Sequence, residues 1–237
     1  MWGIWAFEET IKYARSAGLQ VITDAKRGDG GDTAQAYADG HLGEVPLFDG
    51  ARSASPLRVD ALTVHAWIGT SCVAPFVKAV KKYGTGVFIV DKTSFVPNSE
   101  IEQTITSAGD HNWEMLANLV QAWGEGTEGR YGYRNFGVVM GATYPEDAPK
   151  MRKILPNSWM LVPGYGAQGG GSDGAVTVIN EDGFGGIVSS SRAVIAAWWK
   201  GPFKRDPVYF VEAAALAAEA SRDDLNAALK RAGKLNW

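Results

Sequence analysis

The densest group of charged residues that could do chemistry is the run DAKRGDGGDT, residues 24–33. A lysine between two carboxylates, here Lys26 between Asp24 and Asp29, is held in its charged form and is therefore available as a proton donor. The alternative is a solvated loop with a surface ion pair, which is common and contributes little to stability. Because the charges alternate with glycines directly after an apolar run, the pattern favours a functional site.

A second candidate site combines a glycine-rich loop with an arginine. The loop PGYGAQGGG spans residues 163–171, and the segment SSSR spans residues 189–192. Glycines allow backbone N–H groups to approach an anion, and a helix expected from Ser172 would add its positive N-terminal end. Arg192 would supply a bidentate contact, the alternative being an arginine in solvent. The pattern predicts a phosphate site. The letters GYGAQG also match a dinucleotide fingerprint, but only one predicted strand follows them.

The elements that would position these residues alternate between strands and helices. Continuous runs of Val, Ile and Leu predict buried parallel strands at 19–23, 61–65, 86–90, 136–140, 159–163 and 185–190. Helical patterns lie at 6–18, 33–41, 71–83, 112–124, 146–154, 172–179, 191–199 and 207–231. Such alternation predicts an α/β fold with a parallel sheet, in which residues after the strand ends share one face.

The composition predicts one soluble domain over residues 1–237. The net charge is −3 and the basic residues are scattered, so we expect no nucleic-acid partner. The single cysteine, Cys72, suits a reducing cytoplasm. No stretch approaches the roughly 20 apolar residues of a membrane span, and the start lacks the basic run of a signal peptide. No cluster of His, Cys and carboxylates has metal-site spacing, so we expect no metal.

The run at 24–33 resembles the D-x-K-x-x-D-x-x-x-T signature of orotidine 5′-phosphate decarboxylases. Further segments agree with the longer bacterial form of that family in order: DALTV, KTS, GVVMGATYPE, LVPGYGAQGG and IVSSSR. The resemblance covers residues 1–220. It implies a (β/α)8 TIM barrel that forms homodimers with shared active sites. The implied reaction removes CO2 from orotidylate to give uridylate in pyrimidine biosynthesis, without a metal or other cofactor.

The resemblance also implies roles for individual residues. Asp24 would crowd the leaving carboxylate, Lys26 would protonate C6, and Asp29 would reach into the partner subunit's site and hold that lysine. Thr33 would contact the substrate, and Ser94 would contact the pyrimidine ring. Gln168 would bridge base and phosphate, and Gly169 and Arg192 would bind the phosphate.

The sequence departs from the family pattern in several places. Six predicted strands are too few for an eight-stranded barrel. We therefore expect that the first two βα units, with a ribose-binding Asp and a further Lys, are missing through truncation of the gene model. Gly30 stands where the signature has Ile, His-Ala-Trp at 65–67 replaces Asn-Pro-Tyr, and Phe95-Val96 replaces Asn-Pro. These departures affect details of the base pocket.

Two other functions remain open from the sequence. One is a Mg²⁺-dependent phosphosugar lyase of the same superfamily, such as a hexulose-phosphate synthase. The other is a remnant that binds a phosphate ligand without catalysis.

Overall fold

The computed structural model describes residues 2–95, 99–166 and 168–235. The chain forms two compact units. Unit 1 consists of Met1–Asp91, Met115–Val138 and Asn157–Trp159, and unit 2 consists of Lys92–Glu114, Val139–Pro156 and Met160–Trp237.

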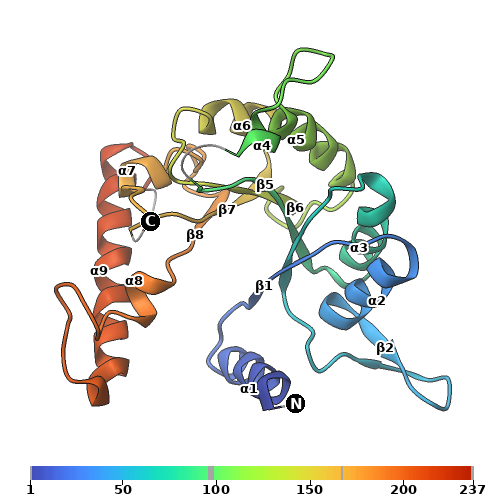
Figure 1. Ribbon diagram of the computed structural model, residues 1–237, viewed down its shortest axis with the longest axis horizontal. Helices are drawn as coiled ribbons and strands as arrows, with labels where there is room; N and C mark the ends of the chain where they lie inside the picture. The colour runs from blue at the N-terminus through green and yellow to red at the C-terminus, as the bar shows by residue number, and fades with distance from the viewer. Residues whose placement is uncertain (1, 96–98, 167, 236–237) are drawn as a thin grey trace. The chain divides into compact units, whose positions relative to one another are not determined.

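Helices and parallel strands alternate along the first part of the chain (Figure 1). The elements are α1 (Trp2–Ser16), β1 (Ile22–Arg27), α2 (Gly31–Leu42), β4 (Ala61–Val64), α3 (Thr70–Tyr83), β5 (Gly86–Lys92), α5 (Asn112–Trp123) and β6 (Arg134–Met140). An antiparallel hairpin of β2 (Glu44–Pro46) and β3 (Arg52–Ala54) lies between α2 and β4. The sequence does not predict this hairpin, because its strands have only three residues each and none of them is buried.

The remaining elements belong mainly to unit 2. They are α4 (Glu100–Gln103), α6 (Ala148–Ile154), β7 (Ser158–Val162), α7 (Ser172–Ala175), β8 (Gly186–Val188), α8 (Arg192–Ile195), the short 3₁₀ helix η1 (Pro207–Tyr209) and α9 (Phe210–Arg231). The main sheet has six strands in the order β1-β4-β5-β6-β7-β8. The pairs β1–β4, β4–β5 and β7–β8 are parallel. The predicted α/β fold with a parallel sheet is confirmed.

The strands are buried as their composition predicts. Every residue of β4 is buried, without the alternation of a half-exposed strand, as expected for a parallel strand that is covered on both faces. In unit 1, α2 and α3 contact each other beside this strand (Figure 1). Among the described residues, no helix is long and apolar enough to span a membrane.

The predicted bounds of the first strand were wrong. The apolar run predicts 19–23, but β1 is Ile22–Arg27 and Leu19 is exposed. Pairing with β4 begins only at Ile22, opposite Ala61. An apolar run indicates which side chains can be buried. The bounds of the strand, however, depend on which residues hydrogen-bond to the backbone of β4. As a result, Asp24 and Lys26 belong to the strand and not to a following loop.

Three elements near the C-terminus are shorter than predicted. The helices expected at 172–179 and 191–199 are single turns, α7 and α8, and the strand expected at 185–190 is only Gly186–Val188. Residues 176–178, Val-Thr-Val, follow α7 in the sequence, and β-branched residues have low helix propensity. A helix does begin at Ser172 as predicted, but with only four residues it has little dipole.

Candidate functional site

In unit 1, the candidate catalytic residues lie on an irregular stretch of β1. Thr23 pairs with Leu62, but Arg27 pairs with Val64, so β1 advances further than β4 over the same interval. Within this bulge, Lys26 has a φ of 48°, in the left-handed region that residues with side chains rarely adopt. Bulges redirect side chains and are frequent beside active sites.

The bulge brings Asp24 and Lys26 together. Lys26 Nζ lies 2.5 Å from Asp24 Oδ2. Thr63, which is fully buried in β4, fixes both residues. Its hydroxyl donates to Asp24 Oδ1 at 2.9 Å and accepts the backbone N–H of Lys26 at 2.9 Å. The side chains of the pair remain open to solvent, at 48% and 63% exposure for Lys26 and Asp24. The arrangement is an accessible ammonium held against a carboxylate.

The glycine after the strand allows a close approach to His65. A Cβ on Gly28 would lie 2.8 Å from the His65 carbonyl oxygen, and the His65 N–H donates to Arg27 O at 2.7 Å. Burial lowers the pKa of His65, and the charge of Lys26 lowers it further. His65 is therefore neutral at physiological pH.

Asp29 and Thr33 are both exposed at the start of α2. Asp29 Oδ1 accepts the Gly30 N–H at 2.7 Å, and Gly30 is the N-cap residue of the helix. Within the described residues of this chain, no hydrogen bond or ion pair joins Asp29 to Lys26. The two residues are near in sequence but do not form one cluster in a single subunit.

In unit 2, two predicted substrate-binding residues meet. The Ser94 hydroxyl donates to Gln168 Oε1. Gly164 makes room for both, because a Cβ there would lie 2.8 Å from Ser94 Cβ and 3.3 Å from Gln168 Oε1. Its φ of 96° is also in the range that favours glycine. The pair therefore depends on a glycine in the loop after β7.

The glycine-rich loop is closed by its own backbone. The Gly166 N–H donates to Gly170 O at 2.9 Å, and the Gly170 N–H donates to Gly164 O at 3.0 Å. The Gly169 N–H donates to Gly166 O at 3.0 Å. Gly169 is exposed at a φ of 91°, and its N–H is engaged within the loop. Ala167 lies outside the described residues.

Arg192 lies beside this loop. It is exposed at the first position of α8. The next residue, Ala193, has its Cβ 3.7 Å from the position that a Cβ on Gly166 would occupy. The glycine loop and the arginine segment are therefore neighbours within unit 2, as a shared phosphate site requires.

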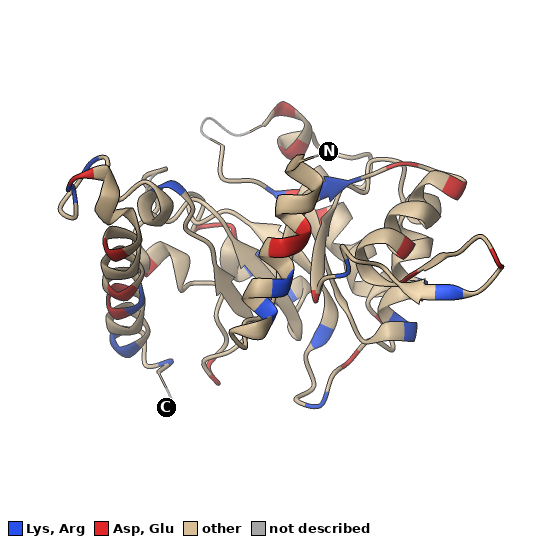
Figure 2. Cartoon of the chain, turned by 90° about the horizontal axis from the view of Figure 1, so that it is seen from below, with Lys and Arg blue, Asp and Glu red and all other residues tan. Residues whose placement is uncertain are grey.

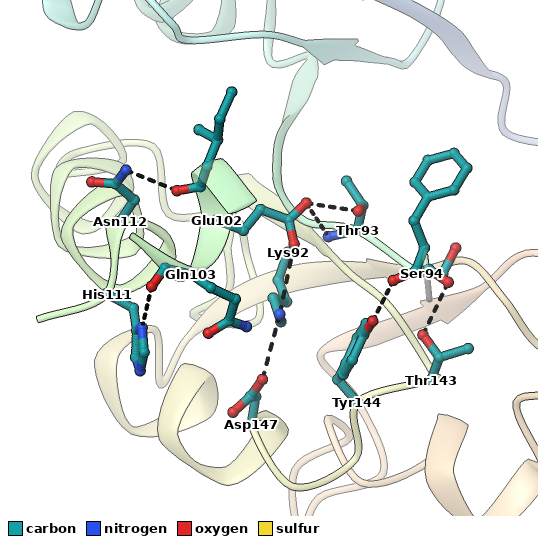
Figure 3. Close-up of polar contacts among 12 residues, drawn as sticks. Lys92, Thr93, Ser94, Glu102, Gln103, His111, Asn112, Thr143, Tyr144 and Asp147 are labelled. Carbon is teal, nitrogen blue, oxygen red and sulfur yellow. Dashed lines mark hydrogen bonds and ion pairs between the residues drawn. The ribbon is translucent and has the colours of Figure 1, made fainter. Parts of the chain in front are cut away.

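A buried cluster of charged residues lies at the end of β5, and none of its members was among the site residues predicted from the sequence. Lys92 is completely buried, with Nζ 3.6 Å from Glu102 Oε2 and 3.6 Å from Asp147 Oδ2 (Figure 3). It also lies 4.1 Å from the centroid of the Tyr144 ring. Burial raises the pKa of Asp147, and the Lys92 charge opposes that rise.

This cluster holds the backbone on both sides of Ser94 (Figure 3). Glu102 Oε1 accepts from the Thr93 N–H at 3.2 Å and from its hydroxyl at 2.6 Å. The Thr143 hydroxyl donates to Ser94 O at 3.1 Å, and the Tyr144 hydroxyl donates to Phe95 O. A lysine at the end of a mostly apolar strand was a sequence signal for this cluster, but the carboxylates of Glu102 and Asp147 lie elsewhere in the sequence. The family departure at Val96 lies outside the described residues.

Neither a metal cluster nor a basic stripe is seen in the described part of the chain. No group of three or more His, Cys, Asp and Glu residues there could hold a metal ion. Basic and acidic residues are interspersed, and both occur along α9 (Figure 2).

A family model and curated relatives both match this chain to orotidine 5′-phosphate decarboxylases. The family model described as "Orotidine 5′-phosphate decarboxylase / HUMPS family" matches residues 2–198. The orotidine 5′-phosphate decarboxylase of Caldicellulosiruptor saccharolyticus is 35% identical over 227 residues, covering 96% of this chain and 72% of the relative. That of Rhodopirellula baltica is 39% identical over 195 residues, covering 82% and 63%.

Solved structures show the same relationship. A putative orotidine 5′-phosphate decarboxylase from Streptomyces avermitilis has a TM-score of 0.75 and 30% identity, covering 96% of this chain and 72% of its own. A putative orotidine-monophosphate decarboxylase from Toxoplasma gondii has a TM-score of 0.75 and 27% identity, covering 98% and 74%.

Proposed function

This chain belongs to the orotidine 5′-phosphate decarboxylase / HUMPS family, and on that basis we propose that it converts orotidylate to uridylate and CO2. The observation that carries the proposal is the contact of 2.5 Å between Lys26 Nζ and Asp24 Oδ2 on the bulge of β1. In the proposed reaction, the ammonium that would donate the proton would thus lie beside the carboxylate that would repel the leaving group.

Unit 1 would supply the chemistry. The bond between C6 and the carboxylate carbon breaks, CO2 departs, and the electron pair stays on C6. Asp24 disfavours the bound carboxylate by charge repulsion, and the Lys26 ammonium stabilises the developing negative charge and donates its proton to C6. Solvent then reprotonates the lysine.

Unit 2 would supply binding energy. Ser94 and Gln168, already hydrogen-bonded to each other, offer polar groups for the pyrimidine ring. Gly169 and Arg192 are proposed to bind the phosphate, and the neighbouring positions of the glycine loop and α8 support this. Contacts to the non-reacting phosphate help to stabilise the transition state formed at C6.

We further propose a homodimer in which Asp29, with Thr33 nearby, serves the partner subunit's site. The exposure of both side chains, and the absence of a described contact between Asp29 and Lys26 in one chain, support this assignment. Cytoplasmic pyrimidine biosynthesis would be the setting of the reaction.

The test is release of labelled CO2 from carboxyl-labelled orotidylate, measured with EDTA present. Wild-type protein should turn over, and Lys26→Ala should lose more than tenfold in kcat, above about 1.4 kcal/mol of barrier. The matched control is Lys12→Ala, which removes an exposed lysine paired with Glu8 and Glu9 on α1 and should leave kcat unchanged.

Other outcomes identify the alternatives. Loss of activity with EDTA, restored by Mg²⁺, would indicate a metal-dependent phosphosugar lyase. Binding of uridylate without turnover would indicate a non-catalytic binding protein. A Lys26→Ala variant that keeps wild-type kcat would exclude Lys26 as the proton donor.

A further inference from the structure

One carboxylate of α9 is bonded to both ends of the glycine-rich loop. Asp224 Oδ2 accepts the Tyr165 hydroxyl at 2.8 Å, and Asp224 Oδ1 accepts the Ser172 hydroxyl at 2.9 Å. Tyr165 and Ser172 flank residues 166–171, the glycine-rich part of the loop. Asp224 therefore closes this stretch from outside, in addition to the hydrogen bonds that the loop makes with itself.

Both hydroxyl donors are well placed to hold this bridge. Ser172 is buried and Tyr165 is partly buried, whereas the carboxylate itself is more exposed. Burial and the hydrogen bond to Asp224 raise the pKa of Tyr165 to about 12, so the phenol stays a donor at physiological pH. Hydrogen bonds to a carboxylate are shorter and stronger than neutral ones.

The same helix also supports the arginine segment. Helix α9 contacts both α7 and α8 within unit 2 (Figure 1). Ala197, after α8, forms a buried cluster with Ala213 and Ala217 of α9, and Trp198 and Phe203 pack against it. One helix thus backs the glycine loop through a charged bridge and the segment of Arg192 through apolar packing.

None of the recognised motifs lies on α9. The family model ends at residue 198, and α9 begins at Phe210. We propose that Asp224 is a positioning residue for phosphate recognition, which acts through Tyr165 and Ser172 and does not touch the ligand. The inference rests on the proposed function, in which this loop binds the phosphate of orotidylate.

The test compares two ligands that differ only in the phosphate. Calorimetry of the full chain would measure binding of uridine 5′-monophosphate and of uridine. Asp224→Ala should weaken uridylate binding about tenfold, a change of about 1.4 kcal/mol, and leave uridine binding unchanged. In turnover, KM for orotidylate should rise more than kcat falls. Asp224→Asn, which keeps one acceptor oxygen, should recover part of the affinity.

The matched control is Asp223→Ala, the adjacent residue on α9. Asp223 is exposed and pairs with its neighbour Arg222, so its loss should change neither affinity. Tyr165→Phe and Ser172→Ala should each weaken uridylate binding less than Asp224→Ala. Added to Asp224→Ala they should have little further effect, because residues in one network are not additive.

A second readout separates this inference from the proposed function. Hydrogen exchange of the amides of Gly166, Gly169 and Gly170 should accelerate in Asp224→Ala and not in Asp223→Ala. If wild-type protein bound no uridylate, the proposed function would fail, and the exchange comparison would decide the role of Asp224 alone. Unchanged exchange, equal weakening of uridine and uridylate, or the same losses in Asp223→Ala would overturn the inference.

Discussion

Replacing Lys92 by Met tests the importance of the buried charge cluster in unit 2. Methionine has a similar length but no charge. The change removes the cation that lies 3.6 Å from each of two carboxylates, those of Glu102 and Asp147. Removing one partner of a buried ion pair typically costs about 3–5 kcal/mol, because the remaining charge is left poorly solvated.

The structure places the expected loss near the lower end of that range. Glu102 keeps two hydrogen bonds from Thr93, and the side chain of Asp147 is 26% exposed and can regain water. Lys92 would also lose its contact with the Tyr144 ring. We therefore expect Lys92→Met to lower the free energy of unfolding by about 3 kcal/mol at neutral pH. Lys12→Met, at an exposed ion pair, should lower the free energy of unfolding far less than Lys92→Met.

The loss should depend on pH with a definite sign. Burial already raises the pKa of Asp147, and removing Lys92 takes away the charge that opposes this rise. A carboxylate whose pKa is raised in the folded state takes up a proton on folding, so stability increases as pH falls through that pKa. The deficit of Lys92→Met should therefore shrink between about pH 7 and about pH 5.

Urea unfolding followed by circular dichroism at the two pH values measures both effects. The double variant Lys92→Met/Glu102→Gln should recover part of the lost stability, because it removes one of the two remaining charges. A deficit below about 1 kcal/mol at neutral pH, or one that grows on acidification, would refute the reasoning.

Two further predictions follow from particular contacts. Gly164→Ala should destabilise the protein by about 1–3 kcal/mol, because its Cβ would lie 2.8 Å from Ser94 Cβ. Thermal unfolding can compare it with Gly3→Ala, where nothing lies within 4 Å. Mixing Lys26→Ala subunits with Asp29→Ala subunits should restore activity, because one site of the heterodimer would carry neither change. An inactive mixture despite demonstrated subunit exchange would assign Asp29 to its own subunit.

The sequence was most informative where function and local pattern coincide. Charges and glycines directly after apolar runs identified Asp24, Lys26 and the glycine loop. The parallel sheet followed from runs of apolar residues that fit strands buried on both faces. The family signature then assigned roles that spacing alone leaves open.

The sequence was least informative where the partner of a residue is distant in the chain. The position of β1 depends on pairing with β4, and the positive φ of Lys26 depends on the bulge that this pairing creates. Asp224 lies 59 residues from Tyr165, in a helix whose Ala-rich pattern indicates only packing. Such bridges leave no local pattern, so a single sequence cannot reveal them.

Lys26 near the end of β1 and Lys92 at the end of β5 differ in how far solvent reaches their side chains. The side chain of Lys92 is completely buried between the carboxylates of Glu102 and Asp147. The side chain of Lys26 is 48% exposed beside Asp24, so solvent can return a proton after each turnover. A donor that acts repeatedly needs this access, whereas a lysine that holds the backbone around Ser94 does not. This difference in exposure favours Lys26 over Lys92 as the proposed proton donor.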